Sequence, residues 1–226
     1  MNKTVSVLLP CRAGSERIKR KNTKPFAGGS LVKIKIDELL KVESIAKIIV
    51  STDDDLVKDI CLQYDSERVL VNDREPYYAS SECSNSEFIR HFAETLDIEG
   101  HLLWTHVTSP FCSADTYKRA IKEYFSLVGE YDSLVSVNVI RGYLWGVDLK
   151  PLSYDLDQMG RWPLTQDIDP AFLINSALFL IPMKLMRETG DRVGKKPYLF
   201  EIDQLESFDI DWPKDFELAE KIWKCL

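Results

Sequence analysis

The amino-acid sequence predicts an α/β fold in which helices cover a mainly parallel β-sheet. Strand-like and helix-like segments alternate along most of the chain, which is the pattern of βα units. The 226 residues, of which 45% are hydrophobic, can bury a core without help from metal ions or disulfide bonds. No linker, repeat or low-complexity tract divides the chain, so we expect a single domain over residues 1–226.

The strands are predicted from short apolar runs that are rich in β-branched residues and bounded by turn residues. The first run contains Val5, Val7 and Leu9 and ends at Pro10. The expected strands span residues 4–10, 46–51, 68–71, 101–107, 132–139, 142–148, 174–181 and 198–202. Ligands of open α/β sheets bind at the carboxyl ends of the strands, so the loops after residues 10, 51 and 107 should line one crevice.

The helices are predicted from apolar residues spaced three and four apart and from the residues that begin each segment. Thr52-Asp53 should cap the second helix, and Ser84 or Asn85 the third. Pro213 should begin the last helix. The expected helices span residues 31–42, 54–63, 84–96, 113–127 and 182–189, with a final helix from residue 213.

Two segments depart from this alternation. Residues 72–88 are rich in serine and asparagine and are expected to form a long loop, which in a compact domain is usually functional. The two strand-like runs after residue 131 flank a tight turn, which predicts a protruding hairpin arm. Tyr143 and Trp145 would be exposed there. We therefore expect the arm, residues 132–160, to contact a second copy of the chain in a homodimer.

Composition excludes several classes of protein. The net charge of -7 argues against nucleic-acid binding, which usually needs a basic face. The five cysteines are scattered, odd in number and without a CxxC pair, so we expect reduced thiols and a cytoplasmic protein. No apolar run is long enough to span a membrane.

A basic loop follows the first strand in this acidic chain. Its six cationic residues are Arg12, Arg17, Lys19, Arg20, Lys21 and Lys24. Gly14 and Ser15 lie between them, and backbone N–H groups beside a glycine can approach phosphate oxygens. Such a loop at the end of a buried strand suits a polyphosphate. The alternative is a solvated basic loop without a ligand.

Asp209 and Asp211 form the second candidate site. In an extended segment, residues two apart face the same way, so both carboxylates could bind one Mg²⁺ ion. The alternative is that Asp211 caps the helix beginning at Pro213. Of the three histidines, His106 lies near a strand end beside Thr108 and is the one we expect to contact a ligand.

Several common catalytic motifs are missing from the sequence. It has no HExxH, no GxGxxG, no GxxxxGK[ST] and no supported Ser/His/Asp arrangement. Dinucleotide chemistry and P-loop hydrolysis are therefore disfavoured.

The segment from Cys11 to Asn22 resembles the signature of the acylneuraminate cytidylyltransferases, the CMP-sialic acid synthetase family. That signature places A-R-x-G-S-K-R-I-P-x-K-N after a short apolar strand. The matching residues are Arg12, Gly14, Ser15, Arg17, Ile18, Lys21 and Asn22. Further matches are Lys24-Pro25-Phe26, Ser51-Thr52-Asp53, Ala79-Ser80, Thr108-Ser109-Pro110, Asn175 with Ala177, and residues 207–211. The resemblance therefore extends over nearly the whole chain.

The resemblance implies a Rossmann-like nucleotidyltransferase fold of three layers and a nucleotidyltransferase activity. Such an enzyme transfers CMP from CTP to the anomeric hydroxyl of a 2-keto sugar acid and releases pyrophosphate, for the synthesis of surface polysaccharides or glycoconjugates. It also implies Mg²⁺ as cofactor and a homodimer in which an arm of one subunit reaches the other. The alternative is a nucleotide-binding module that has lost catalysis and acts as a partner or sensor.

The resemblance also implies roles for individual residues. Arg12 and Lys21 would hold the triphosphate and, with Asp211, act in catalysis. The expected substrate contacts are Ser15 and Asn22 on the nucleotide, Arg74, Ala79 and Ser80 near cytosine, and His106, Thr108 and Asn175 elsewhere in the site. The expected metal ligands are Asp209 and Asp211.

Four positions depart from the family pattern. Glu16 replaces a lysine and places an anion near the phosphates, while Lys19 replaces a proline. His106 stands where the family has a glutamine that touches the sugar. An arginine expected before Gln166 is absent, and Arg161 is the candidate to replace it. The acceptor is therefore left open among sialic, legionaminic, pseudaminic and eight-carbon keto-deoxy acids.

Overall fold

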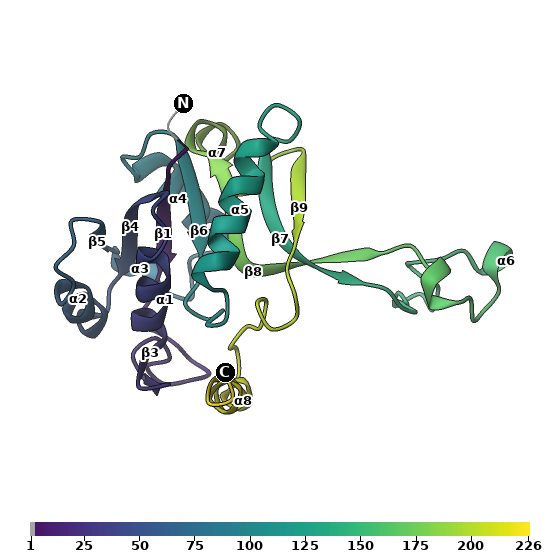
Figure 1. Ribbon diagram of the computed structural model, residues 1–226, viewed down its shortest axis with the longest axis horizontal. Helices are drawn as coiled ribbons and strands as arrows, with labels where there is room; N and C mark the ends of the chain where they lie inside the picture. Colours follow the sequence, from purple (N-terminus) through teal and green to yellow (C-terminus); the bar gives the residue numbers. More distant parts are fainter. Residues whose placement is uncertain (1–2) are drawn as a thin grey trace.

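The computed structural model describes residues 3–226 and is built around a seven-stranded sheet (Figure 1). The strand order is β5-β4-β1-β6-β8-β7-β9. These strands are β1 (Val5–Pro10), β4 (Ile45–Thr52), β5 (Val69–Asp73), β6 (His101–Thr105), β7 (Ser133–Ile140), β8 (Ala171–Pro182) and β9 (Pro197–Glu201). β8 is antiparallel to both neighbours, and every other pairing in the sheet is parallel. The prediction of a mainly parallel sheet is confirmed.

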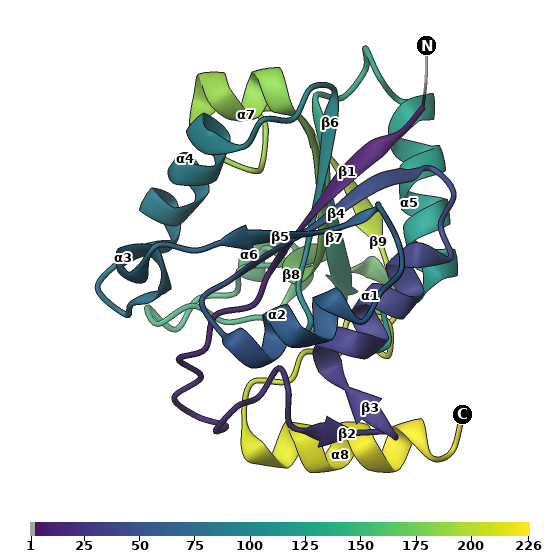
Figure 2. The same ribbon diagram turned by 90° about the vertical axis from the view of Figure 1, so that its left-hand side faces the viewer.

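Helices cover both faces of the sheet, which makes three layers (Figure 2). The helices are α1 (Leu31–Leu40), α2 (Asp55–Leu62), α3 (Pro76–Ala79), α4 (Asn85–Thr95), α5 (Ala114–Ser126), α6 (Leu156–Met159), α7 (Met183–Thr189) and α8 (Pro213–Trp223). Val7 and Leu9 of β1 pack on the side of α1, α2 and α5, while Leu8 faces α4 and α7. This alternation follows from the two-residue period of a strand.

A buried lysine ties α1 to the loop after β6. Lys35 is fully buried, and its Nζ donates to the carbonyl oxygens of Ser109 and Cys112 at 2.8 and 3.0 Å and to the Tyr117 hydroxyl at 2.8 Å. Three hydrogen bonds offset part of the cost of removing an amine from water. They also fix the loop that carries Thr108 into the cavity described below.

Helix caps agree with the sequence at α4 and differ at α2. Ser84 caps α4 in a capping box, with its hydroxyl accepting from Glu87 N and its own N–H donating to the Glu87 carboxylate. At α2 the cap is Asp54, which accepts from Leu56 N, so the prediction that Thr52-Asp53 caps this helix is wrong. The Asp53 carboxylate binds elsewhere, as described below.

The arm is present, but its second strand is not the predicted one. Residues 142–148 form no strand, because the chain curls back on itself: Gly146 N donates to Lys150 O at 2.8 Å and Leu149 takes a positive φ of 62°. The antiparallel partner of β7 is instead β8, with Ile140 opposite Ala171. Figure 1 shows these two strands extending far beyond the other strands of the sheet. The irregular tip between them contains α6 and the short 3₁₀ helix Thr165–Asp167.

Two smaller features complete the fold. The predicted loop at residues 72–88 contains α3, a single helical turn. The strands β2 (Pro25–Phe26) and β3 (Gly29–Ser30) form a small hairpin, and Phe26 packs edge-on against Phe216 of α8 at 5.3 Å between ring centroids. Within residues 3–226, no helix combines the length and apolar character needed to cross a membrane.

Candidate active site

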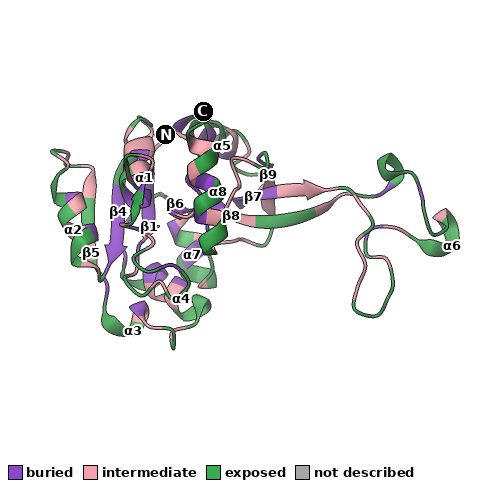
Figure 3. Ribbon diagram, turned by 90° about the horizontal axis from the view of Figure 1, so that it is seen from below, coloured by how far each residue is buried: buried purple, intermediate pink, exposed green. Residues whose placement is uncertain are grey.

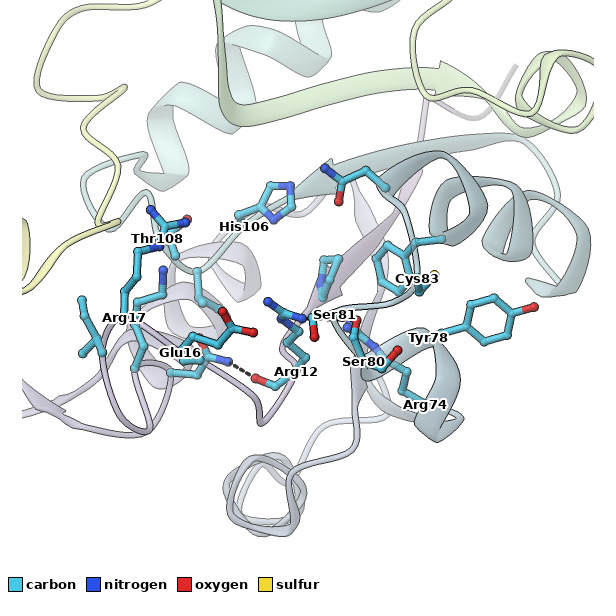
Figure 4. A pocket seen from close by; sticks show the side chains of 18 residues that line it. Arg12, Glu16, Arg17, Arg74, Tyr78, Ser80, Ser81, Cys83, His106 and Thr108 are labelled. Atoms are coloured by element: carbon cyan, nitrogen blue, oxygen red, sulfur yellow. Dashed lines mark hydrogen bonds between the residues drawn. The ribbon is translucent and has the colours of Figure 1, made fainter.

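A cavity of about 420 Å³ lies at the carboxyl ends of β1, β5 and β6. Its lining residues include Pro10, Arg12, Ser15, Glu16, Arg17, Lys21, Asn22, Arg74, Tyr78, Ser80, Ser81, Cys83, Asn85, Phe88, His106 and Thr108. Figure 4 places Arg17 and Thr108 at one end of the cavity and Tyr78 and Cys83 at the other, with Arg12 between. The expected crevice at this edge of the sheet is confirmed for the loops that follow β1 and β6.

The loop after β4 supports this cavity and does not line it. Ala13 N donates to Asp53 Oδ1 at 2.8 Å, and the Thr52 hydroxyl donates to Cys11 O at 2.6 Å. Asn22 Nδ2 then donates to Arg12 O at 3.0 Å across the basic loop (Figure 4). These contacts hold the loop after β1 in a fixed path, so its cationic side chains reach the cavity.

Arg12 crosses the cavity to the loop that follows α3. Its guanidinium donates to the carbonyl oxygens of Ala79 and Ser80 at 3.5 and 3.4 Å. Ser80 lines the cavity, while Ala79 is buried and presents only its carbonyl. Both hydrogen bonds are long, so Arg12 can exchange them for stronger charge-assisted bonds to an anion.

Arg74 lies at the opposite end from Arg17. It is buried, donates to Ser51 O at 2.8 Å and to Ser51 Oγ at 3.3 Å, and stacks on the Phe88 ring at 4.4 Å. Burial lowers the pKa of Arg74 to about 10, which still leaves the guanidinium charged at neutral pH. Arg74 therefore provides a fixed cation and donor beside Tyr78.

Asp209 and Asp211 approach the cavity from the segment before α8, which is irregular and is not the end of a strand. Asp211 Oδ1 lies 3.3 Å from Arg17 NH2 and 3.9 Å from Lys21 Nζ. Lys21 Nζ also donates to Ile210 O at 2.8 Å, and Ile210 N donates to Thr108 O at 2.8 Å. The acidic segment is therefore attached to both the basic loop and the loop after β6.

The capping role considered for Asp211 belongs to Asp215. The Asp215 carboxylate accepts from Asp211 N at 3.0 Å and from Trp212 N at 2.7 Å. The side chain of Asp211 is therefore left for the cations of the basic loop.

The two aspartates fit a hard divalent cation. Asp209 Oδ1 is buried without a hydrogen-bond partner among the described residues, and burial raises the pKa of the Asp209 carboxyl. The pKa of Lys21 is lowered by burial, against the opposing effect of Asp211. Carboxylate oxygens are the ligands that Mg²⁺ prefers. No group of three His, Cys, Asp or Glu side chains suited to a metal occurs within residues 3–226, so remaining ligands would have to come from substrate phosphates or water.

His106 lines the cavity with its imidazole beside two donors. Trp104 Nε1 lies 3.1 Å and Arg192 NH1 3.3 Å from His106 Nε2. Arg192 could not be identified from the sequence, because it lies in a loop 86 residues from His106 and belongs to no recognisable motif.

Asp209 and Asp211 are absent from the cavity lining, although Asp211 pairs with the lining residues Arg17 and Lys21. Asn175 is also absent from the lining. It lies in β8 near the base of the arm, where its Oδ1 accepts from the Ser136 hydroxyl at 2.6 Å and from Ala177 N at 3.2 Å. Its Nδ2 donates to Asn138 Oδ1 at 3.1 Å. Arg161 is also remote from this cavity, on the arm tip over the Trp145 ring at 5.6 Å.

Sequence reasoning missed several lining residues. They are Tyr78, Ser81, Cys83, Asn85 and Phe88, and all of them lie in or next to the segment predicted to be a functional loop. The length of that segment was the available signal. Glu16 also lines the cavity and forms no ion pair within the described part of the chain.

Sequence comparison identifies related proteins. A family model described as cytidylyltransferase matches residues 6–142. A CMP-N,N'-diacetyllegionaminic acid synthase from Legionella pneumophila is 27% identical, covering 96% of this chain and 95% of its own length. A pseudaminic acid cytidylyltransferase from Campylobacter jejuni is 28% identical over the same shares of the two chains. An N-acylneuraminate cytidylyltransferase from Streptococcus agalactiae is 24% identical. The match includes 92% of this chain but only 51%, about half, of that longer protein.

Solved structures of low sequence identity share the fold. A 4-diphosphocytidyl-2C-methyl-D-erythritol synthase from Anaerococcus prevotii superposes with a TM-score of 0.73 at 14% identity, covering 99% of this chain and 97% of the other. A CMP:2-keto-3-deoxy-manno-octonic acid synthetase gives 0.69 at 11% identity, covering 98% and 99%. The expected Rossmann-like nucleotidyltransferase fold is confirmed. Since the family model matches more than half of the chain and the resemblance drawn from the residues is confirmed by named relatives, this protein belongs to the cytidylyltransferase family.

Proposed function

We propose that this chain transfers CMP from CTP to the anomeric hydroxyl of a 2-keto sugar acid and releases pyrophosphate. The single observation that carries the proposal is the cavity itself, in which Arg12, Arg17 and Lys21 gather at the carboxyl ends of parallel strands. A polyphosphate with four negative charges suits this group of cations. The names of the relatives support a sugar acid as the acceptor.

The basic loop would stabilise charge on the leaving pyrophosphate. The attacking hydroxyl is a weak nucleophile, so positioning and charge neutralisation supply most of the catalysis. Arg12 and Lys21 would hold the phosphates in this proposal. Arg12 is available because its two present hydrogen bonds are long, and Lys21 because its partners at Asp211 and Ile210 lie at the cavity edge.

Asp209 and Asp211 would hold Mg²⁺ in the bound enzyme. The unpartnered, buried Oδ1 of Asp209 and the half-exposed carboxylate of Asp211 support this assignment. When bound there, Mg²⁺ would polarise the α-phosphate and neutralise charge on it. Arg17 contributes to the same arrangement, because its ion pair with Asp211 holds that carboxylate beside the basic loop.

The nucleobase would occupy the end of the cavity near Arg74 and Ser80, with Ser15 and Asn22 on the nucleotide between the base and the phosphates. Arg74 is fixed by Ser51 and Phe88, so it would present a donor to a carbonyl oxygen of cytosine. The Ser80 hydroxyl is partly occupied by Tyr77 O at 2.7 Å. The sugar acid would lie near His106 and Thr108, which border the phosphate end of the cavity.

A pyrophosphate-release assay tests the activity. The purified chain is incubated with CTP, Mg²⁺ and each of a panel of nonulosonic and eight-carbon ulosonic acids, with ATP, GTP and UTP as nucleotide controls. Release with CTP and at least one acid is the expected result. Normal CTP binding by calorimetry without release from any acid would instead favour the inactive nucleotide-binding module.

We further propose that the chain forms a homodimer through its arm. Phe172, Leu173 and Ile174 of β8 are 48, 56 and 52% exposed, and successive strand residues point to opposite faces, so neither face of the arm is covered (Figure 3). Sedimentation of the wild type should give a dimer, and Leu173→Lys should shift it toward monomer. Leu62→Lys, at a leucine on α2 that is 78% exposed, is the control that should leave the dimer intact.

We also propose a cytoplasmic location. Cys11, Cys61 and Cys112 are buried free thiols, and none of the described cysteines forms a disulfide. This pattern suits a reducing compartment, where CTP is also available. Fractionation of cells of the source organism with an antibody against the chain would test the location.

A further inference from the structure

Arg192 is a cation whose position beside His106 requires a structural explanation. Its guanidinium stacks on the Phe179 ring at 4.0 Å and on the Trp104 ring at 5.1 Å, with NH1 3.3 Å from His106 Nε2. No carboxylate in residues 3–226 forms an ion pair with it. Burying a guanidinium without an anionic partner is unfavourable. Ion pairing therefore does not explain why Arg192 lies beside His106.

The two donors beside His106 determine where its proton lies. The Trp104 indole N–H can only donate, and it points at His106 Nε2 at 3.1 Å. The Arg192 guanidinium also only donates, and it points at the same atom. Nε2 must therefore carry the lone pair, and the proton of the neutral ring lies on Nδ1.

The surroundings of His106 keep the ring neutral. The charged groups that face it are Arg192, Lys35, Lys21 and Arg74, all of them cations. Burial of the ring, and after it repulsion from these cations, lowers the pKa of His106 to about 3. The ring therefore stays uncharged throughout the physiological range of pH.

The protonated nitrogen is left without a protein partner. His106 lines the cavity, and its contacts with described residues are both made through Nε2. Nδ1 has no hydrogen-bond partner among the described residues, so its N–H remains free for a ligand. The cavity wall at this point thus offers one neutral N–H donor, polarised by the Arg192 charge behind the ring.

We propose that Arg192 is a positioning residue that holds His106 as a neutral Nδ1–H donor, and that this donor binds an acceptor oxygen of the sugar acid. The identity of the substrate in this inference rests on the proposed function, whereas the geometry around His106 does not. A carbonyl or carboxylate oxygen can accept from this N–H, whereas an ammonium group cannot.

The closing experiment follows the histidine nitrogens by NMR in the [¹⁵N]histidine-labelled chain, with His106→Gln used to assign the His106 signals. In the wild type His106 should remain neutral and protonated at Nδ1 between about pH 5 and 8. Arg192→Gln should raise the pKa of His106 above its wild-type value, because one of the cations that repel a charged ring is removed. Arg192→Lys should retain the wild-type pattern, because it keeps the charge. Arg187→Gln is the control, since Arg187 is an exposed arginine that donates to Leu96 O and Ile98 O and does not line the cavity.

Steady-state kinetics on the same variants provide the functional readout. Arg192→Gln should raise KM for the sugar acid about tenfold, the equivalent of one neutral hydrogen bond, and leave KM for CTP near the wild-type value. A wild-type ring protonated at Nε2, or one titrating in the ordinary range, would overturn the inference. So would a raised KM with an unchanged ring, which would mean that Arg192 contacts the substrate directly. If no acid is turned over, the NMR result still stands and the failure belongs to the proposed function.

Discussion

Arg17 and Asp211 form an ion pair, 3.3 Å between NH2 and Oδ1, that joins the basic loop after β1 to the acidic segment before α8. The two residues are nearly two hundred positions apart in the chain. Both side chains are about half exposed, so the pair contributes little to stability. Its effect is instead to orient a carboxylate at the edge of the cavity.

Asp211→Asn should reduce kcat/KM by a factor on the order of 10²–10³, the usual cost of removing one group that stabilises charge in the transition state. The substitution keeps the shape of the side chain and removes its charge. Pyrophosphate release under CTP saturation measures the effect. Glu217→Gln, an exposed carboxylate on α8, is the control and should retain full activity.

Lys21→Met should weaken CTP binding and slow turnover, because the ammonium group lies at the cavity and 3.9 Å from Asp211. Lys19→Met, an exposed neighbour outside the cavity lining, should have little effect. Calorimetric titration with CTP compares the two variants. Equal losses in both would mean that the loop acts only through its overall charge.

Asp209 should make stability depend on pH in an unusual direction. The pKa of Asp209 is raised in the folded chain, so the folded state binds a proton more tightly than the unfolded state does. The free energy of unfolding therefore falls as the pH rises from the unfolded-state pKa through the folded-state pKa of this carboxyl. Asp209→Asn should therefore raise the thermal midpoint at neutral pH without Mg²⁺. The same variant should lose any stabilisation by Mg²⁺ with CTP. A variant that melts at the same temperature as the wild type at every pH would contradict the raised pKa.

Phe216→Ala should destabilise the fold by about 3–5 kcal/mol, because Phe216 is fully buried and packs edge-on against Phe26. Urea unfolding followed by circular dichroism measures the loss. Leu218→Ala lies on the same helix but is 48% exposed, so its effect should be much smaller.

Much of the fold follows from local patterns. The alternating apolar segments predicted the sheet, and Ser84 predicted the start of α4 together with its capping box. The second strand of the arm was not predictable in this way. Residues 142–148 have the composition of a strand, but Gly146 and the positive φ at Leu149 turn the chain back, and β7 pairs with β8 across the irregular tip.

The residues of the candidate site also divide into those with a local sequence signal and those without one. Motif residues such as Arg12 and Ser80 were predicted because the residues beside them carry the family pattern. Asn175 shares that pattern but its amide is committed to Ser136 and Asn138, and such long-range partners leave no mark on the local sequence. Arg192 was missed for the same reason.

The bond from Lys21 Nζ to Ile210 O spans 189 positions of the chain. Contacts between such distant positions close long loops of the chain, which disfavours their early formation. During synthesis the basic loop leaves the ribosome long before the acidic segment does. Until that segment is made, Arg17 and Lys21 lack the Asp211 carboxylate as a partner.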